Sequence, residues 1–229
     1  MKLQFDKRQG GFSLIEIAIV LVIIGLLIGG VLKGQSMVKN SKIKRIATDT
    51  QASQGAISAY MDSYWVQPGD DNNTVDHWGN TALGGNRDGF IDGSLSSTQK
   101  LANNAATQET TLAWNHLVCE NLIKGVCRGN TADAIVHPMN PVGGNTGIAD
   151  GRVAALASAY MGLTKIMVCM GGIPADYAQV YDAQFDDGDG TTLDIRGSAN
   201  DYAGAEGDAV LAAGTAYASG NKITICTAF

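Results

Sequence analysis

Hydrophobic residues are concentrated near the start of the chain. Residues 12–32 read FSLIEIAIVLVIIGLLIGGVL and contain a single ionisable side chain, that of Glu16. As an α-helix this run is roughly 30 Å long, which matches the thickness of the hydrocarbon core of a bilayer. The pattern therefore predicts a helix long enough to span a membrane.

Beyond this run, a narrow stripe of mostly apolar residues recurs at alternating spacings of three and four. Its members are Ile43, Ile46, Thr50, Ser53, Ile57, Tyr60 and Tyr64. This spacing is typical of one face of a helix, and no turn signal appears before the stretch Gln-Pro-Gly-Asp-Asp at 67–71. We therefore expect one helix over 12–64, whose second half packs under a globular domain.

Residues 66–229 show weaker periodicity. Their pattern predicts helices over 111–123, with Leu112, Trp114, Leu117 and Leu122 facing inward, and from Ile173 to about Phe185. Strands are expected at 165–170 and 222–228, a third at 192–196, and an extended loop at 197–220. Helices first and antiparallel strands later indicate an α+β domain.

Composition and charge narrow the class of protein. The chain of 229 residues is 45% hydrophobic and 17% charged, which excludes an intrinsically disordered chain. The formal net charge of −6 argues against a general nucleic-acid binder. Residues 1–65 hold eight Lys/Arg against four Asp/Glu, whereas residues 66–229 hold eight against eighteen. A basic-flanked apolar helix is thus joined to an acidic globular region.

The apolar run has three interpretations: a signal peptide that is removed on export, a plain membrane anchor, or a processed segment that stays in the product. A signal peptide has an apolar core of about 7–15 residues followed by Ala-x-Ala, and this run is longer and lacks that site. A carboxylate such as that of Glu16 costs about 2.5–3.5 kcal/mol in a spanning helix, so it indicates a function beyond anchoring. The leader MKLQFDKRQGG, positive through Lys2, Lys7 and Arg8, would stay cytoplasmic.

The segment KRQGGFSLIEIAIVLVIIGLL closely resembles the prepilin cleavage and methylation motif of type IV pilins and type II secretion pseudopilins. The resemblance implies that a prepilin peptidase cuts between Gly11 and Phe12 and that the new amine of Phe12 is N-methylated. It also implies that Glu16 neutralises the Phe12 amine of a neighbouring subunit, which sets the register of subunits. Many type IV pilins carry Pro where this chain has Lys33, a departure from the pattern.

The resemblance implies a pilin-like α+β fold, in which a long N-terminal helix packs on a C-terminal antiparallel sheet. The expected organisation is a cleaved leader (1–11), a transmembrane and filament-core helix (12–34), its amphipathic continuation (35–65) and an acidic globular domain (66–229). The implied partners are prepilin peptidase, identical or related pilin subunits in a helical filament, and an inner-membrane assembly platform. The subunit would lie in the inner membrane with its N-terminus cytoplasmic, and in a periplasmic or extracellular filament after assembly.

The function expected from this resemblance is that of a structural subunit of a pilus or pseudopilus. A minor pilin with an adhesive or ligand-binding role at the tip is the alternative. No Gly-x-Ser-x-Gly, P-loop or His-Glu-x-x-His motif occurs, so an enzyme is not expected. DNA capture would need a basic stripe, and the acidic domain argues against it. The basic residues at 39–45 are interpreted as a solvated face near anionic lipid headgroups; the alternative is pairing with acidic loops of adjacent subunits.

Four cysteines lie on the side of the membrane where an oxidising compartment is expected, so disulfides are the default. Three pairings are open, and we favour Cys119–Cys127 and Cys169–Cys226. The first closes a short excursion from helix to loop, and the second ties two expected strands and resembles a bridge found in many pilins. Zinc is not expected, because no Cys-x-x-Cys occurs and the histidines are scattered.

Two acidic segments are candidates for a structural calcium site; no other cofactor is expected. In residues 86–93, Asn86, Asp88 and Asp92 have the alternating spacing of an EF-hand loop. Gly84 and Leu95 replace the usual terminal acids, and the missing oxygens could come from Asp70, Asp71 or Asp76. The second segment contains Asp182, Asp186, Asp187, Asp189 and Asp194. The alternative for both is a set of surface turns in which Asp and Asn bond their own backbone.

Overall fold

The computed structural model describes residues 11–79, 84–93, 108–127, 137–153, 162–198, 217 and 222–229. The chain divides into two compact units, Met1–Ser41 and Lys42–Phe229. The leader residues Lys2, Lys7 and Arg8 lie outside the described residues, as do Leu95 and most of the loop expected at 197–220.

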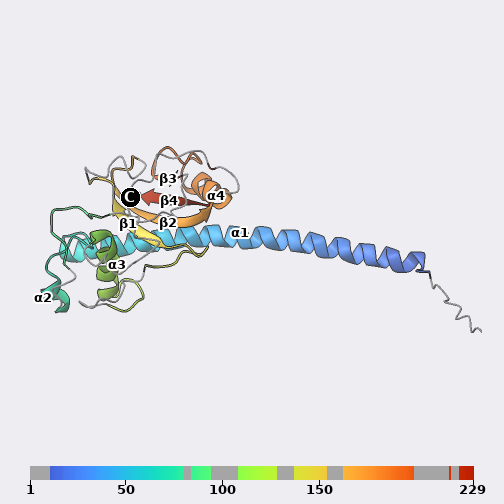
Figure 1. Cartoon of the computed structure of the whole chain (residues 1–229), viewed down its shortest axis with the longest axis horizontal. Coiled ribbons are helices and arrows are strands. Elements are labelled where there is room, and N and C mark those ends of the chain that lie inside the picture. The colour runs from blue at the N-terminus through green and yellow to red at the C-terminus, as the bar shows by residue number, and fades with distance from the viewer. Residues whose placement is uncertain are drawn as a thin grey trace, which may run out of the picture. The chain divides into compact units, whose positions relative to one another are not determined.

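Helix α1 runs from Leu14 to Tyr64 without interruption, as the hydrophobic pattern predicts (Figure 1). Its apolar side chains up to Val38 are exposed; Leu14 and Leu26, for example, are 92% and 73% accessible. Among the described residues, α1 is the one helix long and apolar enough to cross a membrane.

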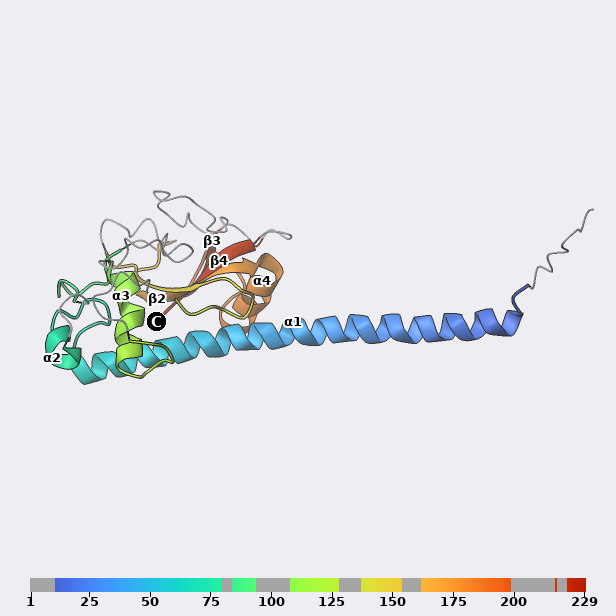
Figure 2. The ribbon, with the colours of Figure 1, turned by 60° about the horizontal axis from the view of Figure 1, so that its bottom comes forward.

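The second unit contains a four-stranded antiparallel sheet in the order β1-β2-β4-β3. Figure 2 shows β2, β3 and β4 of this sheet beside helix α4 (Ala175–Phe185). The strands are β1 (Thr146–Asp150), β2 (Ile166–Pro174), β3 (Ile195–Ser198) and β4 (Lys222–Ala228). The register between β2 and β4 shifts between Met170 and Ile173. Gly172 adopts a positive φ of 70° at this bulge, a conformation that glycine adopts at little cost.

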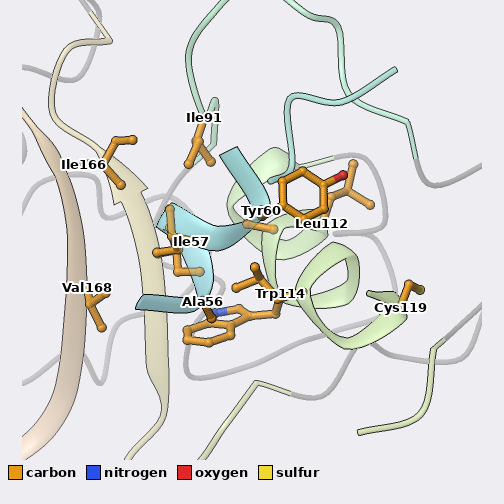
Figure 3. Close-up of a cluster of buried hydrophobic side chains, with 12 residues drawn as sticks. Ala56, Ile57, Tyr60, Ile91, Leu112, Trp114, Cys119, Ile166 and Val168 are labelled. Carbon is orange, nitrogen blue, oxygen red and sulfur yellow. The ribbon is translucent and has the colours of Figure 1, made fainter. Parts of the chain in front are cut away.

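One face of the sheet packs on the second half of α1. Alternate residues of β2 contact α1 in two hydrophobic clusters. Ile166 and Val168 belong to the cluster that contains Ala56, Ile57 and Tyr60 of α1. Met170 belongs to the cluster that contains Ile43 and Ile46. Figure 3 shows one of these clusters, in which side chains of α1, of helix α3 (Glu109–Cys119) and of β2 come together; Trp114 belongs to α3. The predicted stripe is confirmed: its residues from Ile43 to Tyr60 are all buried, and only Tyr64 is partly exposed.

Three further helices complete the described part of this unit: α2 (Thr74–Trp78), α3 (Glu109–Cys119) and α4 (Ala175–Phe185). Helix α2 and strand β1 were not predicted from the sequence. The predicted extension of α3 to residue 123 was also wrong: the chain turns at Asn121 (φ 60°), and Leu122 is 36% exposed rather than inward. The α+β, pilin-like fold class is confirmed by the long helix and the antiparallel sheet.

The structure contains two disulfides, Cys119–Cys127 and Cys169–Cys226, which are the pairs favoured from the sequence. The first joins the end of α3 to the following loop. The second joins β2 to β4 at directly opposed positions, on the face of the sheet that points away from α1.

His137 makes the stability of this unit depend on pH. Burial lowers the pKa of its imidazole to about 4, although the ring bonds the carbonyl of Thr146 at 3.2 Å. The unfolded chain takes up the proton near pH 6.5, whereas the folded chain does so only near pH 4. Stability attributable to His137 is therefore complete above about pH 6.5 and is lost as pH falls toward 4, by about 3 kcal/mol.

We expect His137→Asn to reduce this loss, because Asn offers an N–H for the Thr146 carbonyl but does not titrate. The measurement is the free energy of unfolding of both proteins at pH 7.5 and 4.5. Burial raises the pKa of Asp70 and Glu109, which acts in the opposite direction, but equally in both proteins. Identical pH profiles would show that His137 does not carry the effect.

Candidate functional site

The N-terminus of α1 forms a reciprocal cap. The backbone N–H of Ser13 donates to Oε2 of Glu16 (2.8 Å), and the N–H of Glu16 donates to Oγ of Ser13 (3.2 Å). This is a capping box, which satisfies two N–H groups that a helix start leaves without partners. The sequence analysis did not use this signal, although the spacing Ser-x-x-Glu is its signature.

The residues at which cleavage and methylation are expected, Gly11 and Phe12, lie beside this cap and are exposed. Phe12 is 84% exposed, and no atom lies within 4 Å of a side-chain position built on Gly11. Within the described residues, no basic side chain pairs with Glu16, whose carboxylate contacts only the cap. That Glu16 neutralises a cation of a neighbouring subunit stays a prediction.

Residues 6–32 match the family described as the prokaryotic N-terminal methylation motif, and the match includes Gly11, Phe12 and Glu16. The chain carries the signature of type IV pilins and pseudopilins. No curated protein and no solved structure matches the chain significantly.

The pilin motif indicates a type IV pilin-like or pseudopilin precursor, which suggests a structural protein. The single apolar helix fits membrane anchoring of a pilin. The motif also implies processing by prepilin peptidase and assembly with other pilins. The globular unit, Lys42–Phe229, lies outside the matched residues.

The first acidic group joins the EF-hand-like segment to two distant residues. Oxygens of Asp70, Asp88 and Glu109 lie within 4.8 Å of one another. The buried Asp70 carboxylate accepts the N–H groups of Asp88 (3.0 Å) and Gly89 (2.9 Å). Burial raises the pKa of Asp70 despite these bonds.

Glu109, the first residue of α3, closes the same group. Its carboxylate is buried and accepts the N–H groups of Asn86 and Asp92, both at 2.8 Å. Burial raises the pKa of Glu109 and of Asp92, and nearby carboxylates raise both further. Glu109 was not among the predicted ligands, because nothing in the local sequence links it to residues 86–92, whose N–H groups its carboxylate accepts.

The structure distributes the candidate oxygen donors unevenly. Asn86, Asp88 and Asp92 lie together, since the Asn86 amide donates to Asp88 (3.0 Å) and Asp92 (3.3 Å). Of the three suggested supplements, only Asp70 belongs to the group. Asp71 instead accepts the hydroxyl of Tyr60 (2.7 Å), and Asp76 lies in α2.

The second acidic group lies at the C-terminal end of α4. Oxygens of Asp182, Asp186 and Asp187 lie within 4.8 Å of one another. Asp182 is fully buried; its Oδ2 accepts the hydroxyl of Tyr217 (2.6 Å), and burial raises its pKa. Asp189 lies outside this trio and accepts the N–H of Thr191 (3.1 Å), whereas Asp194 pairs with Lys165 (2.9 Å).

Both groups consist of carboxylate oxygens, which hard cations such as calcium prefer, but many of these oxygens also bond backbone N–H groups, as the surface-turn alternative requires. Calcium binding remains a prediction. If the dissociation constant is about 0.1 mM, as in extracellular modules, calcium at 10 mM should stabilise the chain by about 2.7 kcal/mol. The melting temperature would then rise by about 5–11 °C.

Two single variants separate the groups in this measurement. Asp88→Asn should remove the calcium-dependent shift if the first group binds, and Asp186→Asn if the second does. Magnesium at equal concentration is the control for ionic strength, because it requires a tighter octahedral site. An unchanged melting temperature with 10 mM calcium would refute both sites.

Proposed function

We propose that this chain is a structural subunit of a type IV pilus or type II secretion pseudopilus, processed by prepilin peptidase and assembled through α1. The observation that carries the proposal is the coincidence of the methylation motif with an apolar helix whose side chains are exposed on all sides. Such a surface is unfavourable in water, so it needs lipid before assembly and neighbouring helices afterwards.

The charge of the leader supports the orientation of the subunit. Lys2, Lys7 and Arg8 precede the apolar run, so the N-terminus stays cytoplasmic and the globular unit lies across the membrane. The two disulfides agree with that placement, because disulfides persist in oxidising compartments.

Mass spectrometry of the sheared surface fraction and of the membrane fraction tests this function. We expect a mature chain that begins at N-methylated Phe12 in membranes, and the same chain in filaments. Gly11→Leu should block cleavage and leave the precursor in the membrane. A precursor that is never cleaved in the unaltered protein would refute the proposal.

The same material separates the finer alternatives. An abundant chain in purified filaments identifies a major subunit, and a trace amount identifies a minor subunit with a role at the tip. Filaments that contain the chain and are sheared from the cell surface identify a pilus. Filaments that are found only in the envelope identify a pseudopilus.

A further inference from the structure

Helix α1 presents a basic surface at the start of the globular unit. Lys44 and Arg45 are exposed, whereas Ile43 and Ile46 on either side of them are buried in the core. We call Lys44 and Arg45 the basic face. In the described part of the chain their one ion pair is Arg45–Asp49 (3.6 Å), with the Arg45 side chain 72% exposed. An exposed pair of this kind contributes only about 0.3–0.5 kcal/mol.

Distance along the helix argues against lipid as the partner of the basic face. Lys44 follows Leu32, the end of the apolar run, by 12 positions, which is about 18 Å of helix. The headgroup layer extends only about 5–8 Å beyond the hydrocarbon core. Lys44 therefore lies about 10 Å beyond the headgroup layer. This distance is close to the Debye length at physiological ionic strength, so salt screens the attraction between Lys44 and the headgroups. A protein partner is therefore favoured.

The same chain carries a segment of complementary charge. We call residues 186–194 the acidic loop. Asp187, Asp189 and Asp194 are exposed in it, and Asp194 already pairs with Lys165. Asp186 holds the loop in shape by accepting the N–H groups of Asp194 (3.0 Å) and Ile195 (2.8 Å). Asp187 accepts the N–H of Asp189 (2.9 Å). The charges of the loop are thus fixed in position before any partner binds.

Apolar side chains flank these charges. Leu193 is 58% exposed and Phe185 is 49% exposed. Leu193 also has a φ of 51°, a conformation that costs a bulky residue about 1–3 kcal/mol. A strained, exposed leucine beside fixed carboxylates is expected of a surface that is covered in an assembly.

We propose that the basic face of one subunit binds the acidic loop of a second copy of the chain. Lys44 and Arg45 would pair with Asp187 and Asp189, while Leu193 would be covered by the neighbour. No ion pair joins these two surfaces within the described part of one chain. Because the surfaces differ, the contact is heterologous, and repetition of such a contact generates an open helical filament. This inference rests on the proposed function.

Zero-length carbodiimide crosslinking of sheared filaments tests the contact directly. We expect a covalent dimer in which Lys44 is joined to Asp187 or Asp189, identified by mass spectrometry of filaments assembled from mixed isotopic labels. Filaments that give no such crosslink, or give it only within one chain, would overturn the contact. An unaltered chain that is never cleaved after Gly11, and that enters no filament on cells or in the envelope, would instead refute the proposed function.

A charge exchange provides the second measurement. Lys44→Glu/Arg45→Glu and Asp187→Lys/Asp189→Lys should each lower filament yield at least about tenfold, since like charges then meet. The four changes together should restore yield to within about threefold. Lys124→Glu and Asp62→Lys alter exposed charges elsewhere and should have no effect. Wild-type yield from either double variant, or no recovery in the combination, would overturn the contact; the second result would point to lipid or local unfolding.

Discussion

Replacement of Glu16 by alanine should leave cleavage and membrane insertion intact but lower the yield of sheared filaments at least about a hundredfold. In the proposed filament core the Glu16 carboxylate neutralises the Phe12 amine of a neighbour. Removal of one member of a buried ion pair costs about 3–5 kcal/mol, because the remaining charge is left without a partner. The measurement is the ratio of sheared to membrane-bound chain, determined by quantitative immunoblot.

The capping box supplies the controls for this experiment. Glu16→Gln keeps an oxygen that can accept the Ser13 N–H, since Gln also serves in capping boxes, but it removes the charge. Ser13→Ala removes the hydroxyl that accepts the Glu16 N–H and retains the carboxylate. We expect Glu16→Gln to fail in assembly as Glu16→Ala does, and Ser13→Ala to assemble within about threefold of the unaltered chain.

The two controls distinguish a charge effect from a defect in the helix start. Efficient assembly of Glu16→Gln would refute charge neutralisation as the role of Glu16. Failure of Ser13→Ala, with normal cleavage, would show that the cap itself is required. Loss of a cap alone costs about 1 kcal/mol, which is too little to abolish assembly.

Helix α1 could be predicted from the sequence because its hydrophobic pattern is long. The apolar run and the stripe from Ile43 to Tyr60 extend over many helical turns, so the periodic signal is long and its two halves agree. Strand β4 could also be predicted, because apolar and polar residues alternate along it after the charged Lys222. Its observed limits, Lys222–Ala228, are those predicted.

The missed elements are short and depend on tertiary contacts. Strand β1, TGIAD, has little β-propensity of its own and is formed by pairing with β2, in which Ile148 lies opposite Val168. Helix α2 has five residues and ends at Gly79, which adopts a left-handed conformation. Neither segment is long enough for periodicity to identify it.

In the candidate calcium sites, too, some contacts follow from the local sequence and others depend on the fold. Alternation along residues 86–92 was sufficient to place Asn86, Asp88 and Asp92 together. Asp70 and Glu109 join them from separate segments, so only the fold reveals those contacts. The burial of Asp182 likewise depends on α4 packing against the sheet and could not be read from a run of acidic residues.

Removal of the Cys169–Cys226 disulfide should destabilise the globular unit by about 1.5 kcal/mol more than removal of Cys119–Cys127. The first closes a separation of 57 residues and the second a separation of 8. The loop-entropy relation gives about 4 kcal/mol for the long loop and about 2.5 kcal/mol for the short one. Paired Cys→Ala variants of the full chain in detergent should therefore melt about 8–16 °C and about 5–10 °C lower, respectively.

The origin of this difference lies in the unfolded chain. In the folded state Cys169 and Cys226 are already directly opposed in the β2–β4 ladder, so the sheet should keep its register without the bond. The unfolded chain, by contrast, gains the freedom of a long loop. The Cys169→Ala/Cys226→Ala variant should consequently show a larger dependence of unfolding free energy on denaturant, because its unfolded state exposes more surface. Equal destabilisation by the two variants, with unchanged denaturant dependence, would mean that lost packing around Cys169 and Cys226, rather than chain entropy, determines the effect.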